Sequence, residues 1–117
     1  EIMLACVHGR LADAHIHWSV GAATTVVLAS EDYPGTYAKG RPIRGLDAAG
    51  ALDGVIVFHA GTALHGDEIV TAGGRVLAVT AVGIGLDEAR RRAYAGVGEI
   101  EFEGMQYRSD IARVWGE

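Results

Sequence analysis

Short runs of β-branched and aliphatic residues, separated by glycines, constrain the fold of this chain more than any other feature. Residues 55–60 and 75–82 are two such runs. The 117-residue sequence holds 17 glycines, and only 7% of its residues are aromatic. Apolar runs of about 4–8 residues bounded by turn residues are typical of strands. We therefore expect a β-rich core built mainly from valine, isoleucine, leucine and alanine.

The strand predictions follow these runs. Residues 22–30 are rich in threonine and valine and almost continuously apolar, which predicts a strand covered on both faces. Residues 55–60 predict a compact buried strand. Residues 68–71 and 75–82 flank Ala-Gly-Gly at 72–74, which predicts that these two strands form a hairpin.

The strongest helix prediction covers residues 86–100. One apolar stripe supports it: Leu86, Ala89, Ala93, Val97 and Ile100. Asp87 and Arg91, and likewise Glu88 and Arg92, stand four residues apart with the acid first, the more favourable order on a helix. Both acids lie in the first turn, where they complement the helix dipole.

Shorter elements complete the prediction. Residues 2–9 indicate a short helix, and residues 46–52 indicate one or two helical turns. Tyr33-Pro34-Gly35-Thr36 indicates a type II turn, with proline and then glycine at its central positions. The predicted fold class is α+β. Its core is mainly antiparallel and similar to a barrel-sandwich, with a short N-terminal helix and a long helix near the C-terminus.

Composition excludes several classes of protein. The formal net charge of −5 has the wrong sign for a general nucleic-acid or anionic-membrane binder. No apolar run approaches the ~20 residues that cross a bilayer. The single cysteine, Cys6, forms no internal disulfide and fits a cytoplasmic location. A phosphate loop, a dinucleotide fingerprint and a zinc motif are all absent from the sequence.

Three histidines are candidate functional residues. His15 and His17 alternate along residues 14–18, which predict a strand. The pair has the spacing of two metal ligands but lacks a third, so a polar strand face in water is favoured over a metal site. His59 lies in the predicted buried strand, where a hydrogen-bonded core histidine is favoured over a catalytic base.

Gly73-Gly74-Arg75 has the most suggestive chemistry. Two glycines let successive N–H groups point at an anion, and arginine adds a charged fork. From the residues alone, a plain hairpin turn with an exposed arginine explains the same residues and is favoured over an anion site. Other cations are interpreted as solvated: Lys39, Arg41 and Arg44 on a loop, and Arg90, Arg91 and Arg92 on a helix.

Several segments together resemble one family. The most specific are residues 57–62 (Val-Phe-His-Ala-Gly-Thr) and residues 70–81, which contain Thr-Ala-Gly-Gly-Arg-Val-Leu. Further matching segments cover most of the rest of the chain: 29–30, 33–35, 39–43, 86–89, 93–94 and 104–111. Together they resemble the C-terminal domain of glycinamide ribonucleotide synthetase (phosphoribosylamine–glycine ligase). Gly96, Gly98 and the glycines of 83–85 depart from the family pattern and put local helix stability in question.

The resemblance implies an activity for the intact protein. Enzymes of this family are ATP-grasp ligases of purine biosynthesis. They join glycine to phosphoribosylamine through an acyl phosphate, consume ATP with magnesium, and release ADP and phosphate. The ATP and magnesium ligands of the family lie upstream of the matching region. We therefore expect no catalytic residue, metal site or cofactor in this chain, and no activity from it alone.

The resemblance also implies a domain division and a site. Residues 1–18 would end the ATP-grasp body, and residues 19–117 would form the small C-terminal β-rich domain, of the rudiment hybrid motif type. The upstream domains of the same chain would be its partner, which fits a sequence that starts at Glu1 rather than Met. In related ATP-grasp enzymes the equivalent hairpin contacts a ribose phosphate. Gly73, Gly74 and Arg75 are therefore predicted to help bind the phosphate of phosphoribosylamine.

Two other functional interpretations stay open at this point. A biotinyl or lipoyl carrier domain also uses short strands, but it needs a lysine at a tight hairpin tip. The single lysine, Lys39, precedes Gly-Arg-Pro in a loop instead. A free-standing interaction domain would require a gene of about this length.

Overall fold

The computed structural model describes residues 1–113. Residues 114–117, which include Trp115 and end the predicted C-terminal domain, lie outside the described residues. The elements in chain order are α1 (Ile2–Val7), η1 (Leu11–Asp13), β1 (Ala22–Ala29), α2 (Leu46–Gly50), β2 (Val55–His59), β3 (Thr62–His65), β4 (Glu68–Thr71), β5 (Arg75–Gly83) and α3 (Leu86–Glu99). Antiparallel strands, a short N-terminal helix and a long helix near the C-terminus confirm the predicted α+β class.

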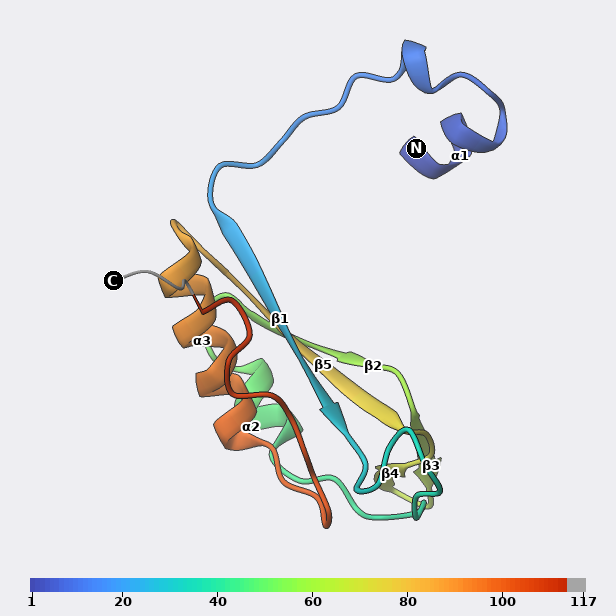
Figure 1. The fold of residues 1–117 in the computed structure, drawn as a ribbon, viewed down its shortest axis with the longest axis vertical. Helices are drawn as coiled ribbons and strands as arrows, with labels where there is room; N and C mark the ends of the chain where they lie inside the picture. The colour runs from blue at the N-terminus through green and yellow to red at the C-terminus, as the bar shows by residue number, and fades with distance from the viewer. Residues whose placement is uncertain (114–117) are drawn as a thin grey trace.

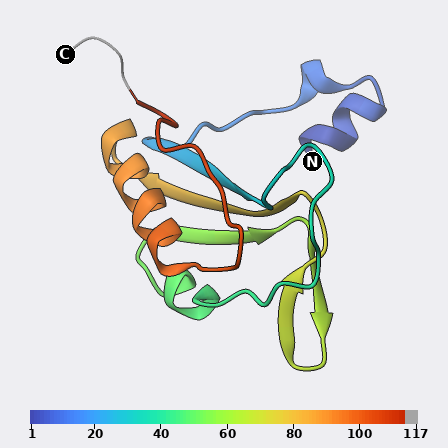
Figure 2. The same cartoon turned by 60° about the horizontal axis from the view of Figure 1, so that its bottom comes forward.

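The strands form two sheets (Figure 1). β5 is the central strand of a three-stranded sheet in the order β1-β5-β2, and it pairs antiparallel with both neighbours. β3 and β4 form a separate two-stranded sheet, a ribbon that projects from the body of the molecule (Figure 2). The prediction of a hairpin between β4 and β5 is therefore wrong. β4 folds back on β3 through the two-residue turn at 66–67, where Gly66 has φ +62°.

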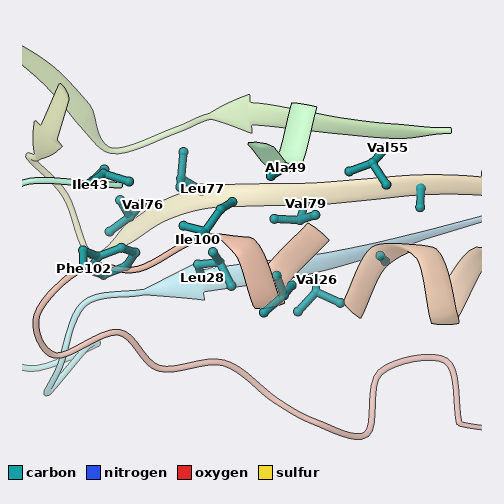
Figure 3. Packing of buried hydrophobic residues seen from close by; sticks show 13 residues of the cluster. Val26, Leu28, Ile43, Ala49, Val55, Val76, Leu77, Val79, Ile100 and Phe102 are labelled. Atoms are coloured by element: carbon teal, nitrogen blue, oxygen red, sulfur yellow. The ribbon is translucent and has the colours of Figure 1, made fainter. Parts of the chain in front are cut away.

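In the part of the chain that the structure describes, only one face of the three-stranded sheet is covered. α3 packs against β5 and β1, and α2 packs against β2 and α3. The core lies between these layers, and its side chains come from both (Figure 3). The strand predicted at 22–30 forms as β1, but Thr24, Val26 and Leu28 are buried while Ala23, Thr25 and Val27 are exposed. The prediction that both faces are covered is therefore wrong.

β2 shows the same alternation. Val55 is buried, whereas Ile56 and Phe58 are 51% and 52% exposed. The strand predicted at 55–60 forms, but the prediction that it is buried is wrong. β2 is an edge strand of a sheet that carries helices on one side alone. The continuous apolar run at 55–60 does not show that one face of the strand is exposed.

The predicted helices form close to their predicted bounds. α3 buries Ala89, Ala93 and Val97 against the sheet, as the apolar stripe predicts. Gly96 is buried too, and a Cβ there would lie 2.9 Å from Cγ1 atoms of Val55 and Val79. This glycine lets the helix lie close to the sheet, which outweighs its low helix propensity.

Two local predictions are wrong. Residues 14–18 form no strand, because no neighbouring strand pairs with them in the described structure. The turn at 33–36 is also of another type. Gly35 N–H donates to the Asp32 carbonyl (2.6 Å), so the turn runs from Asp32 to Gly35 and Pro34 is its third residue. The Tyr33–Pro34 peptide bond is cis, as in a type VI turn.

The chain after α3 is held against that helix. The Tyr94 hydroxyl donates to the Arg108 carbonyl (2.6 Å) and accepts from Ile111 N–H (3.1 Å), and Arg90 donates to the Ile111 carbonyl (3.1 Å). Arg108 also donates to the Asp110 carboxylate at 2.8 Å, and this hydrogen bond lowers the pKa of Asp110. The interpretation of Arg90 as a solvated side chain is therefore wrong.

Within residues 1–113, every helix is too short or too polar to cross a membrane.

Candidate functional site at the Gly73–Arg75 corner

Residues 72–74 form a corner that carries the chain from the two-stranded sheet to the three-stranded sheet. Gly61 approaches this corner closely, because its carbonyl accepts from both Ala72 N–H (2.7 Å) and Gly73 N–H (3.1 Å). A Cβ on Gly61 would lie 2.7 Å from the Gly73 Cα. The two backbones therefore touch, and side chains would separate them.

Ser30, which directly follows β1, contacts the other side of the corner. Its N–H donates to the Gly74 carbonyl (2.8 Å), and its hydroxyl donates to the Gly73 carbonyl (2.9 Å). Ser30 is buried, with 4% of its surface exposed. Gly73 therefore uses both its N–H and its carbonyl within the protein, and the expectation that this N–H points at an anion is wrong.

A surface depression of about 490 Å³ lies beside the corner. Tyr33, Gly61, Gly74 and Arg75 form part of its lining, and small apolar side chains of β1 and β5 form much of the rest. The Tyr33 ring lies directly on Gly74, because a Cβ there would be 2.0 Å from Tyr33 Cδ2. Gly74 thus provides room for this aromatic wall.

Arg75 begins β5 and is exposed at the edge of this depression. Within residues 1–113, its guanidinium makes no hydrogen bond or ion pair. Two of the three loop cations, Arg41 and Lys39, contact other side chains. Arg41 pairs with Glu103 (2.9 Å), and Lys39 lies 5.9 Å from the ring centroid of Tyr37. An unpaired guanidinium beside a concave surface can bind an anion such as phosphate in a bidentate manner.

The three candidate histidines are all exposed. His59 is exposed at the end of β2 rather than buried, so the prediction of a core histidine is wrong. Its Nδ1 lies 3.0 Å from the Thr62 hydroxyl. His15 and His17 are exposed in a loop. Among residues 1–113, no group of three His, Cys, Asp or Glu side chains is arranged to hold a metal ion.

Arg92 of α3 makes two ion pairs. Arg92 pairs with Glu88 (3.0 Å), as the helix spacing predicts, and also with Asp53 (3.1 Å).

The tip of the β3–β4 hairpin carries Gly66 and Asp67 and no lysine, while Lys39 lies in a loop. This placement does not favour the carrier-domain interpretation.

Comparison with known proteins decides the family. The family model described as "Phosphoribosylglycinamide synthetase, C domain" matches residues 23–114. The chain belongs to this family. The matched region contains the corner, its supporting residues and both sheets except Ala22, the first residue of β1. It thereby confirms the family to which the sequence motifs point.

Curated relatives agree with this assignment. The phosphoribosylamine–glycine ligase of Streptomyces coelicolor is 52% identical over 114 residues, which cover 95% of this chain and 27% of that protein. The trifunctional purine biosynthetic protein adenosine-3 of Gallus gallus is 50% identical over 112 residues, covering 95% of this chain and 11% of that protein. This synthetase C-domain chain thus spans about a quarter or less of the length of these two relatives.

A solved structure supports the fold. The crystal structure of phosphoribosylamine–glycine ligase from Thermotoga maritima matches with a TM-score of 0.72 and 34% sequence identity. The match covers 94% of this chain and 27% of that one.

Proposed function

We propose that this chain is the C-terminal domain of a phosphoribosylamine–glycine ligase of purine biosynthesis. The intact enzyme forms an amide bond between the glycine carboxyl and the amine of phosphoribosylamine, and ATP becomes ADP and phosphate. The single observation that carries the proposal is the 52% identity, over 95% of this chain, to a protein of that name. Alone, the domain is proposed to be inactive.

ATP supplies the phosphoryl group that activates the glycine carboxyl, and magnesium neutralises the ATP phosphates. We assign both to the preceding domains. The described residues of this chain gather no set of three metal-ligating side chains, and the relatives have most of their length outside the matched region. We propose that this chain's own contribution is substrate binding at the edge of the site.

Arg75 is the residue we propose to bind the phosphate of phosphoribosylamine. Its guanidinium is exposed, unpaired among residues 1–113 and next to a depression of about 490 Å³. Gly73 and Gly74 shape the corner that presents it, through the contacts with Gly61 and Tyr33. A sugar phosphate fits such a site because one end is a dianion and the other is compact and partly apolar.

Replacing Arg75 with alanine in the intact enzyme should raise the KM for phosphoribosylamine by about 10- to 100-fold, because a charge-assisted bidentate contact contributes about 1.5–3 kcal/mol. The KM values for ATP and glycine should stay within about twofold. Steady-state kinetics with each substrate varied in turn measures this. Arg91→Ala, at an exposed position on α3, is the control. An unchanged KM for phosphoribosylamine would refute the role of Arg75.

We further propose the domain division near residue 18. Residues 1–21 contain no buried residue, and several large apolar side chains there are exposed: Met3, Leu4, Val7, Trp18 and Val20. In Figure 1 this segment runs away from the sheet. The family model begins at residue 23, whereas the Streptomyces coelicolor match covers 95% of this chain. Residues 1–18 therefore fit the end of the preceding domain.

We also propose that the uncovered face of the three-stranded sheet packs against the preceding domains. Val27, Ile56, Phe58 and Val82 are each 42–52% exposed there. Apolar patches of this kind are typical of interfaces. The occupant is the preceding part of the same polypeptide, because relatives such as the Streptomyces coelicolor protein extend over almost four times the matched length.

Phe58→Ser in the intact enzyme tests this face. Burial of the ring at a domain interface predicts a loss of about 3 kcal/mol in the free energy of unfolding. Ile84→Ser is the control, because Ile84 is 93% exposed at the turn before α3, and its loss should stay within about 0.5 kcal/mol. Urea denaturation measures both. If both variants lose the same small amount of unfolding free energy, Phe58 is exposed to solvent in the intact enzyme.

The location we propose is the cytoplasm, where the exposed thiol of Cys6 stays reduced. Small-molecule substrates are the proposed ligands. The acidic net charge of −5 does not favour nucleic acid or an anionic membrane as a partner.

A further inference from the structure

Ser30 directs both of its hydrogen-bond donors at the two residues that precede Arg75. Its N–H bonds to the Gly74 carbonyl at 2.8 Å, and its hydroxyl bonds to the Gly73 carbonyl at 2.9 Å. Ser30 is 4% exposed, so water does not compete strongly for these bonds. A single buried residue directly after β1 thus holds two successive peptide units of the corner.

Gln106 extends this arrangement from the end of the chain. Its side-chain Nε2 donates to the Ser30 carbonyl (2.8 Å) and lies 3.5 Å from the Tyr33 carbonyl. Its backbone exchanges two hydrogen bonds with Ala29, at 2.8 and 2.9 Å. The segment that carries both Ser30 and Tyr33 is therefore fixed by a residue 76 positions later in sequence.

This support matters because the corner is made of glycines. Two successive glycines have more conformational freedom than any other dipeptide, so an arginine that follows them would sample many positions. A guanidinium that must meet a phosphate at a fixed distance binds better when its backbone is already in place. Hydrogen bonds from a buried serine add to the constraint that the Gly61 contacts and the pairing of Arg75 with Ala29 provide.

We propose that Ser30 is a positioning residue for Arg75, with Gln106 holding Ser30 in place. This inference rests on the proposed role of Arg75 in binding the phosphate of phosphoribosylamine. Ser30 and Gln106 do not touch the substrate. They fix the corner so that the guanidinium stays at the edge of the depression.

Ser30→Ala in the intact enzyme is the first test. We expect the KM for phosphoribosylamine to rise about five- to tenfold, which corresponds to the loss of one buried hydrogen bond. The kcat and the KM values for ATP and glycine should stay within about twofold.

Gln106→Glu is the second variant. It keeps the shape but replaces the donor facing the Ser30 carbonyl with an acceptor, and it should raise the same KM. Gln106 is exposed, so this variant decides the matter if Ser30→Ala does not fold.

Tyr94→Phe is the matched control. It removes a hydroxyl that makes two hydrogen bonds, to the Arg108 carbonyl and from Ile111 N–H, but the hydroxyl holds the chain against α3 and has no contact with the corner. We expect its KM for phosphoribosylamine to be unchanged. An equal rise in all three KM values for Ser30→Ala, or a rise in Tyr94→Phe as large as in Ser30→Ala, would show a merely structural role.

A double-mutant cycle separates this inference from the proposed function. If Ser30 acts through Arg75, adding Ser30→Ala to Arg75→Ala should raise the KM by less than twofold, because the group that Ser30 positions is already gone. An unchanged KM in Arg75→Ala would overturn both proposals. A raised KM in Arg75→Ala with unchanged values in Ser30→Ala and Gln106→Glu would overturn the positioning role alone.

Discussion

Replacing Gly45 with alanine is expected to lower the free energy of unfolding of this chain by about 3 kcal/mol or more. Gly45 precedes α2 with φ +80°, and a Cβ there would lie 1.7 Å from the Glu99 carbonyl oxygen at the end of α3. Left-handed backbone costs an alanine about 1–2 kcal/mol. Separating two packed helices to relieve a clash with backbone costs about 1–3 kcal/mol more. Urea denaturation followed by circular dichroism measures the loss.

Gly40→Ala is the matched control for this prediction. Gly40 has nearly the same backbone angle, φ +78°, but a Cβ there would meet no atom within 4 Å. It should therefore show only the cost of the backbone conformation, about 1–2 kcal/mol. The difference between the two variants isolates the contact of Gly45 with α3. Equal losses would mean that α2 and α3 are less closely packed than the structure describes.

Leu28→Ala is expected to lower the free energy of unfolding by about 3 kcal/mol, within the range of 2–5 kcal/mol for buried leucines. Leu28 is fully buried and lies among the core residues between the sheet and the helices (Figure 3). Its removal takes away apolar burial and leaves a cavity that the paired strands β1 and β5 are unable to fill without losing their register. The midpoint of urea denaturation should fall while the slope stays constant.

Leu64→Ala provides the comparison for Leu28. The same side chain is deleted from β3, where Leu64 is 74% exposed, so the loss should stay within about 0.5 kcal/mol. A loss at Leu64 as large as that at Leu28 would contradict the assignment of the core. A changed denaturation slope in Leu28→Ala would instead indicate an altered unfolded or partly folded state.

Local pattern was enough to place most elements along the chain. The apolar stripe and charge order at 86–100 predicted α3, and the β-branched runs at 22–30 and 75–82 predicted β1 and β5 within one or two residues. These signals are local because helix and strand periodicity repeats every few residues. The sequence motifs also identified the family, which the family model confirms.

Pairing and burial were not determined locally. Residues 68–71 and 75–82 each predicted a strand correctly, but turn residues at 72–74 suggested the wrong partner. Gly66 with Asp67 was the better turn signal, since glycine followed by aspartate is common in two-residue hairpin loops. The covered and open faces of β1 and β2 depend on where α2 and α3 pack, which no window of sequence contains.

By itself, the sequence determined where most elements lie along the chain and which family the chain belongs to. It also singled out Arg75, after two glycines, as a candidate anion-binding residue. The tertiary structure alone decided that the Gly73 N–H donates to the Gly61 carbonyl, and that Ser30 and Gln106 support the corner from distant parts of the chain. The physical reason is range. Periodicity and turn chemistry act between near neighbours, whereas a hydrogen bond between residues 43 or 76 positions apart exists only once the whole chain has packed.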